Sequence, residues 1–261
     1  MEKIIRCATQ NDMESMRALW VECFPNDIEY SSFFFERIFR LECARVCEIG
    51  GEIAAMLHSF PYDFSTPEGV LNAKYIYGVG TSKKFRSKGI AGELLENEAR
   101  DCDFTVIIPQ SESLFDFYER NGFTEIFTVS RKEAESGEKM NFTKAHSSDI
   151  EKLNEMYEAM CSGTLHPIRT YERWETIMAE FEFLGGGIAL LDDGYCAYYE
   201  YDGRFRISEL CSPSGNSPFG YECASVRIGD DSRIGAARPV SERAKIIFGK
   251  DYGRYLNLMH N

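Results

Sequence analysis

The chain has 261 residues, 44% of them hydrophobic and 27% charged, with a formal net charge of −13. This length allows one large domain or two modest ones, each with its own core. The acidic balance argues against nucleic acid as a partner. No apolar run is long enough to span a membrane, and the first residues lack signal-peptide features, so we expect a cytoplasmic protein without a membrane partner.

The first half of the sequence predicts a mixed sheet. Apolar residues at three-to-four spacing predict a helix over 11–24 that Pro25 ends, and phenylalanines dominate the helix that follows. An antiparallel meander and then a strand–helix–strand crossover come after these two helices. The expected strands are 3–8, 45–49, 53–60, 70–81, 104–108 and 123–129, and the expected helices are 11–24, 29–40, 90–102 and 111–120.

The second half repeats the opening order of the first. Residues 130–140 are polar and read as a linker. A capping box, Ser148 with Glu151, predicts the start of a helix. The expected elements are a strand near 140–143, helices at 148–161 and 170–183, and strands at 188–191, 195–201 and 205–210. We therefore predict an α/β (α+β) fold of two similar domains, 1–132 and 133–261, each a mixed, largely antiparallel sheet flanked by helices.

The nine cysteines predict neither disulfides nor a metal site. Their number is odd, and no two are spaced as Cys-x-x-Cys. No histidine or second cysteine pair completes a zinc pattern around Cys43 and Cys47. We expect reduced thiols and no bound metal.

A basic island interrupts the acidic sequence where a predicted strand ends and a helix begins. It consists of Lys83, Lys84, Arg86 and Lys88, and Gly89 follows directly. The first amides of a helix have no intrahelical partner and bind phosphate readily. The island therefore indicates a site for a small polyanion, although by itself it also fits an ordinary surface turn.

Two motifs resemble those of the GCN5-related N-acetyltransferase (GNAT) superfamily. Arg86-x-x-Gly89-x-Ala91, after a long strand and opening a helix, resembles motif A, and the segment 117–123 resembles the end of motif B. The resemblance covers about residues 1–130 and implies that domain 1–132 binds acetyl-CoA and is catalytic. It places the donor site at Val79, Gly80, Thr81, Arg86, Ser87, Lys88, Gly89, Ile90, Ala91, Gly92 and Ser113.

The resemblance also implies that Tyr118 is the general acid that protonates the leaving thiolate. The alternative is that Tyr118 is a packed aromatic residue. The general base is left open, because strand residues 73–81 contain no carboxylate. Ordered water is one alternative, and His58 is another, although we interpret His58 first as a structural residue.

The two-half organisation resembles the enhanced-intracellular-survival (Eis) acetyltransferases, which are tandem GNAT proteins. In that group the terminal carboxylate serves as base, which would be that of Asn261 here. We expect no room for their additional sterol-carrier-like domain. The second half lacks a motif A and is expected to be a degenerate GNAT-like domain that shapes the acceptor pocket. Four aromatic residues of the second half could line that pocket or could equally pack in the core: Trp174, Tyr198, Tyr199 and Tyr201.

The resulting hypothesis is an acetyl-CoA-dependent N-acetyltransferase that acts on a small cationic amine or a peptide amine. Two alternatives remain: a non-catalytic acyl-CoA-binding regulatory module, and a purely structural tandem domain. The sequence leaves a homo-oligomer open.

Overall fold

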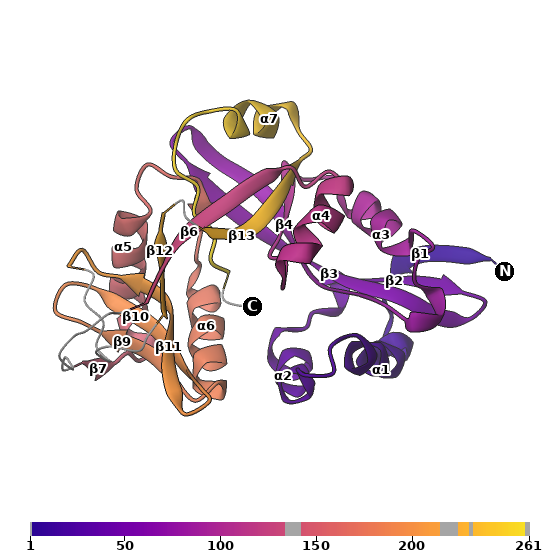
Figure 1. The fold of residues 1–261 in the computed structure, drawn as a ribbon, viewed down its shortest axis with the longest axis horizontal. Helices are drawn as coiled ribbons and strands as arrows, with labels where there is room; N and C mark the ends of the chain where they lie inside the picture. The colour runs from indigo at the N-terminus through magenta and orange to yellow at the C-terminus, as the bar shows by residue number, and fades with distance from the viewer. Residues whose placement is uncertain (1, 134–141, 215–223, 230–231, 259–261) are drawn as a thin grey trace. The chain divides into compact units, whose positions relative to one another are not determined.

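The computed structural model describes residues 2–133, 142–214, 224–229 and 232–258. The chain divides into two compact units (Figure 1). Unit 1 comprises Met1–Asp63, Leu71–Ile126 and Gly235–Lys250, and unit 2 comprises Phe64–Val70, Phe127–Ile234 and Asp251–Asn261. Within the described ranges, no helix is long and apolar enough to cross a membrane.

The strands of unit 1 form a mixed sheet, as predicted. Their order is β1-β2-β3-β4-β5-β13. The β4–β5 pair is parallel, while β1–β2, β2–β3 and β5–β13 are antiparallel. The bounds are β1 (Lys3–Cys7), β2 (Ala44–Ile49), β3 (Glu52–Thr66), β4 (Gly69–Thr81), β5 (Phe104–Ile107) and β13 (Ser232–Pro239).

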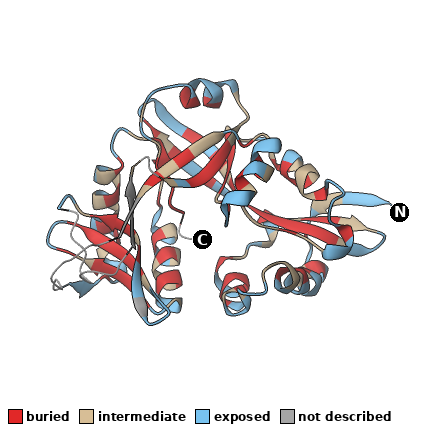
Figure 2. Cartoon of the chain, viewed as in Figure 1, coloured by how far each residue is buried: buried red, intermediate tan, exposed pale blue. Residues whose placement is uncertain are grey.

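Helices cover both faces of β2–β4. On one side lie α1 (Met13–Cys23) and α2 (Ile28–Phe33), and on the other lie α3 (Ile90–Glu98) and α4 (Glu112–Arg120) (Figure 1). Helix α1 buries Met16, Leu19 and Trp20, which share one helix face by their three-to-four spacing. Figure 2 shows the buried residues concentrated on the strands and on the inner faces of these helices.

Three predicted boundaries in unit 1 were wrong for local reasons. The predicted helix 29–40 is α2 followed by a π-helical turn, Phe34–Ile38, which Phe39 N closes by donating to Phe34 O. The predicted helix 90–102 ends at Glu98, because the Lys74 ammonium donates to the Glu98 and Arg100 carbonyls at 3.2 and 2.7 Å. Strand β3 continues beyond the predicted end at 60 to Thr66, whose hydroxyl donates to Gly69 O in the turn to β4.

A C-terminal segment that the sequence assigned to the second domain is part of unit 1. Strand β13 pairs with β5, with Ala236 opposite Ile107 and Pro239 opposite Phe104. Helix α7 (Glu242–Phe248) follows, and Phe248 meets Phe104 edge-on at 5.2 Å between ring centroids. Neither β13 nor α7 was predicted, and the 1–132 and 133–261 division differs from the compact units at this segment.

Unit 2 contains the second predicted cycle in the expected order. Its strand order is β6-β12-β11-β10-β9-β7, and β8 (His166–Pro167), which was not predicted, pairs with the end of β3. The other bounds are β6 (Glu125–Glu133), β7 (Thr143–Lys144), α5 (Ile150–Met160), α6 (Tyr171–Phe183), β9 (Gly187–Leu190), β10 (Tyr195–Tyr201), β11 (Arg204–Cys211) and β12 (Ala224–Ile228).

Two local predictions in unit 2 need correction. The predicted linker 130–140 begins as strand, because β6 runs to Glu133 and pairs with β12, while 134–141 lies outside the described residues. The predicted capping box of Ser148 and Glu151 is not used. Instead Asp149 accepts the backbone N–H of His146 at 2.8 Å, so the cap lies at a short 3-10 turn before α5.

A buried ion pair lies in the core of unit 2. Arg169 donates to both carboxylate oxygens of Glu209, at 2.6 and 2.7 Å, and neither side chain is more than 2% exposed. The Tyr195 and Tyr255 hydroxyls also donate to Glu209, at 2.6 and 2.5 Å. Arg169 further donates to the carbonyl of Asn257, so this network holds the segment that follows residue 250 in unit 2.

Candidate functional site

Strands β4 and β5 part from one another before β4 ends. Their parallel register runs from Ala73 opposite Phe104 to Ile76 opposite Ile107. Strand β4 continues through 77–81 without a partner in β5, so its main-chain groups on this side are not used by that ladder. Of the predicted donor-site residues, Val79, Gly80 and Thr81 lie on this free part.

A glycine with a left-handed backbone lies near the start of the free part of β4. Gly78 has φ +58°, a conformation that L-residues other than glycine rarely adopt. A glycine inside a strand often marks a tight bend or the close approach of another group. The sequence analysis did not select Gly78, although a glycine two positions before Gly80 in a long strand is the signal that marks it.

The basic loop after β4 is held by contacts at both of its ends. Ser82 N donates to Ala54 O at 3.0 Å, and Phe85 is buried in the core that α3 and α4 share with the sheet. The Arg86 side chain turns back, with Nε donating to Thr81 O at 3.0 Å. These contacts fix the loop against the end of the strand.

The backbone of this loop turns sharply before α3. Ser87 and Gly89 both have positive φ, at +61° and +75°, and the first intrahelical bond runs from Glu93 N to Gly89 O at 3.1 Å. Within the part of the chain that the structure describes, no hydrogen bond occupies the amides of 86–92. Successive free amides at a helix start form an anion-binding arrangement.

The loop side chains add positive charge unequally. Lys84 is paired with Glu52 at 2.6 Å, so its charge is compensated. Lys88 Nζ lies 5.1 Å from the centre of the Phe85 ring and has no ion pair among the described residues. A Cβ on Gly92 would lie 2.6 Å from the Asn121 side-chain oxygen, so this glycine permits close packing of α3 at this point.

Tyr118 lies on α4 in the same core cluster as Ile90, and Val79 packs against that cluster. The structure therefore brings the predicted acid, the start of α3 and the free part of β4 together. Burial raises the pKa of Tyr118 well above its ordinary value, so its phenol is protonated at neutral pH. Within the described residues its hydroxyl makes no hydrogen bond, so it can donate one to a ligand.

Ser113, the remaining predicted donor-site residue, is exposed in the first turn of α4. Its hydroxyl lies 3.0 Å from that of Ser111, the N-cap residue. It does not share the core cluster that holds Tyr118. Helix α4 begins at Glu112, shortly after β5 ends at Ile107, which is the last residue of β5 paired with β4.

His58, on β3, is completely buried, and neither ring nitrogen has a hydrogen-bond partner among the described residues. Burial lowers its pKa to about 3, which the nearby backbone of Tyr77 only partly opposes. The imidazole is therefore neutral at pH 7. Asn261, whose carboxylate was the other candidate base, lies outside the described residues.

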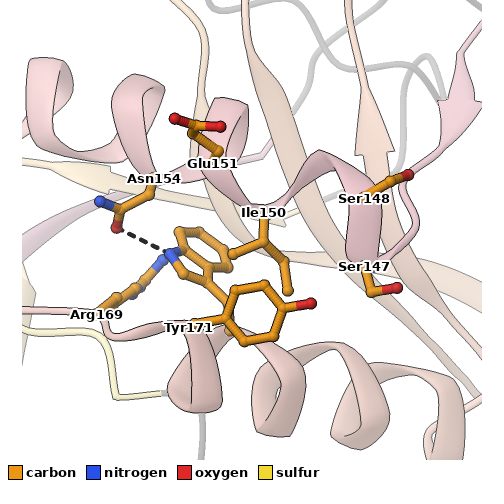
Figure 3. A pocket seen from close by; sticks show the side chains of 8 residues that line it. Ser147, Ser148, Ile150, Glu151, Asn154, Arg169 and Tyr171 are labelled. Carbon is orange, nitrogen blue, oxygen red and sulfur yellow. Dashed lines mark hydrogen bonds between the residues drawn. The ribbon is translucent and has the colours of Figure 1, made fainter.

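Unit 2 has a pocket of about 510 Å³ at the start of α5 and α6 (Figure 3). Trp174 forms part of its wall and donates to the Asn154 side-chain oxygen at 2.9 Å. Tyr171, which is labelled in Figure 3, is 56% exposed. Of the aromatic residues considered for an acceptor pocket, Tyr198 instead belongs to a core cluster, and Tyr201 is exposed. The lining residues are Ser147, Ser148, Ile150, Glu151, Asn154, Arg169, Tyr171 and Trp174.

The first half of the chain is similar to one known domain family. Residues 4–126 match the family model of the acetyltransferase (GNAT) domain. The match ends at Ile126, where the compact unit that contains the free β4 segment also divides from unit 2. No curated protein matches the chain significantly.

Solved structures resemble the chain over both of its halves. A protein from Enterococcus faecalis V583, described as a probable N-acyltransferase, is 14% identical with a TM-score of 0.68, over 93% of this chain and 74% of that one. A GCN5-related N-acetyltransferase from Anabaena variabilis is 15% identical with a TM-score of 0.70, over 92% and 73%. Eis1 from Mycobacterium abscessus is 12% identical with a TM-score of 0.62, over 95% and 76%. These likenesses establish the fold, and they confirm the predicted mixed, largely antiparallel architecture.

Proposed function

We propose that the protein transfers an acetyl group from acetyl-CoA to an amine, because residues 4–126 match the family model of the acetyltransferase (GNAT) domain. The observation that carries the proposal is the row of unoccupied amides at 86–92, beside a strand segment that has parted from β5. The amides suit the pyrophosphate of the donor, and the strand segment suits its amide-bearing arm and thioester.

Donor binding in this proposal depends mainly on main-chain groups. The positive φ of Ser87 and Gly89 turns successive N–H groups outward at the start of α3, where the helix dipole favours negative charge. Lys88 adds a cation that has no ion pair in the described part of the chain. The open space around a Cβ at Gly89 leaves room for phosphate oxygens to approach the main chain.

The proposed reaction is direct attack of the amine on the thioester carbonyl carbon. A C–N bond forms, the C–S bond breaks, and the amine loses one proton. A backbone N–H on the free part of β4 stabilises the negative charge that develops on the carbonyl oxygen. Tyr118 donates its phenolic proton to the leaving sulfur, for which burial keeps it protonated. Strand β4 contains no carboxylate. In this proposal the amine proton leaves to water, and Tyr118 regains its proton from water.

We infer that the acceptor is a small cationic amine or a peptide amine. The net charge of −13 attracts cations over a longer range than single contacts do. The pocket in unit 2 carries Glu151 and the exposed ring of Tyr171, groups that suit an organic cation.

Thiol release from acetyl-CoA, followed over a panel of amines, tests this proposal. The panel should contain a polyamine, an aromatic ethylamine, a lysine-containing peptide and an amine-free blank. Turnover with one class and not with the blank is the expected result. Tight CoA binding without any turnover would favour a non-catalytic acyl-CoA-binding regulator, and absence of CoA binding would favour a purely structural role.

A further inference from the structure

An unusual backbone conformation, an energetically unfavourable buried group and an unusual helix turn meet at one place on the α1 and α2 face of unit 1. Gly78 has a positive φ on β4, and the buried imidazole of His58 on β3 has no hydrogen bond among the described residues. The π-helical turn Phe34–Ile38 lies against this imidazole, with the Phe34 ring 4.9 Å from it between centroids. Features of these kinds concentrate at functional sites.

Aromatic rings from several elements surround the imidazole of His58. The ring of Phe60 stacks on it at 6.2 Å between centroids, and Phe39 meets it edge-on at 5.6 Å. Trp20 lies at 5.9 Å, and its indole N–H is likewise buried without a partner in the described structure. A site that serves only packing would favour a phenylalanine here, because an unpaired buried polar group is destabilising.

His58 and Trp20 both lie against the backbone of β4 at Gly78. A Cβ on Gly78 would lie 3.1 Å from His58 Nδ1 and 2.8 Å from Trp20 Cζ3. The imidazole is therefore next to the peptide groups that begin the free part of β4. The backbone of Tyr77 is the polar group that favours a proton on the imidazole, and its carbonyl is the only acceptor that this backbone offers.

We propose that His58 is a positioning residue for acyl transfer, whose imidazole N–H holds the Tyr77 carbonyl when the donor binds along β4. A peptide group is planar with its C=O and N–H opposed, so holding the Tyr77 carbonyl also sets the direction of the Gly78 N–H. The amide of Gly78 then faces the thioester oxygen in one orientation. This inference rests on the proposed function.

Replacing His58 by phenylalanine separates packing from positioning. The variant His58→Phe removes two unpaired nitrogens and fits the aromatic surroundings, so we expect its melting temperature to rise by about 2–4 °C. We also expect kcat to fall by roughly tenfold or more, because the oxyanion donors lose their fixed direction. The KM for acetyl-CoA should stay unchanged, since the phosphate loop is not altered. A stabilised variant with the kcat of the wild type overturns the inference.

The pair His58→Asn and His58→Leu provides a matched test that does not depend on the phenylalanine variant folding. Asparagine and leucine have nearly the same shape, so the cavity each leaves is similar, and only asparagine retains an N–H close to the Nδ1 position. We expect His58→Asn to keep a kcat several times that of His58→Leu. Equal values in the two variants overturn the inference.

The outcome for His58 is distinct from the outcome for the proposed function. If the wild type shows no turnover with any amine, the proposed acetyl transfer fails, and the positioning role fails with it. If the wild type turns over and His58→Phe is equally fast, only the positioning role fails. In either case the difference in melting temperature between the wild type and His58→Phe reports the cost of burying the unpaired imidazole.

Discussion

Gly89 and Gly51 allow the phosphate loop to be tested against a control with the same backbone strain. Both have positive φ, at +75° and +85°, and a Cβ added at either would meet nothing within 4 Å. An alanine at either position should therefore destabilise unit 1 by a similar amount, about 1–2 kcal/mol, through the left-handed backbone alone. Gly51 lies in the turn between β2 and β3, outside the amides at 86–92, although the next residue, Glu52, pairs with Lys84 of the loop.

Glutamate at the two positions separates strain from ligand binding. At Gly89 the new carboxylate faces the donor phosphates, and two like charges about 4 Å apart repel by roughly 1 kcal/mol in water and about 4 kcal/mol near a protein surface. We expect Gly89→Glu to weaken CoA binding by at least about tenfold, since about 1.4 kcal/mol corresponds to tenfold. Gly51→Glu should bind CoA as the wild type does.

The assay is calorimetric titration of CoA into each variant, with thermal unfolding of the same samples. Equal melting temperatures for the two glutamate variants with unequal CoA affinities is the expected pattern. If Gly89→Glu binds CoA as tightly as Gly51→Glu, the amides at 86–92 do not hold the phosphates, and the assignment of the donor site is wrong.

Four further outcomes follow from particular residues. Tyr118→Phe should lower kcat by about a hundredfold with little change in the KM for acetyl-CoA, and unchanged steady-state kinetics would exclude Tyr118 as the acid. Glu209→Gln should destabilise unit 2 by about 3–5 kcal/mol in urea unfolding, because Arg169 stays charged and buried; a loss below about 1 kcal/mol would contradict this. Hydrogen bonds from Arg6 lower the pKa of Asp12. They therefore stabilise the folded protein fully above pH about 4, and this stabilisation is lost as the pH falls. Acid unfolding of Asp12→Asn should not show this loss. The pKa of His58 is lowered to about 3, so the free energy of unfolding of the wild type should fall by up to about 1.4 kcal/mol per pH unit below pH about 6.5. The stability advantage of His58→Phe should grow over that range. A constant difference between the two proteins would show that the imidazole is not held neutral.

The sequence determined the features that depend on neighbouring residues. The basic loop and the start of α3 were located from the basic residues between a predicted strand and a predicted helix, and from Gly89 that follows them. The structure gives Gly89 a positive φ, which a glycine adopts at no steric penalty. The order of helices and strands followed from spacing and from turn residues. The resemblance of 117–123 to a known motif placed Tyr118 on the helix that enters the shared core.

Only the tertiary structure decided the features that join distant segments. The alternation of apolar residues does not say which strand edge accepts β13, because that choice depends on the free edge of β5, more than a hundred residues earlier. Gly78 lies against Trp20 from α1 and His58 from β3, a contact that no local pattern contains. Glu209 likewise finds Arg169 across unit 2. Local patterns reflect the conformations of a few adjacent residues, whereas these contacts are selected by the free energy of packing the whole unit.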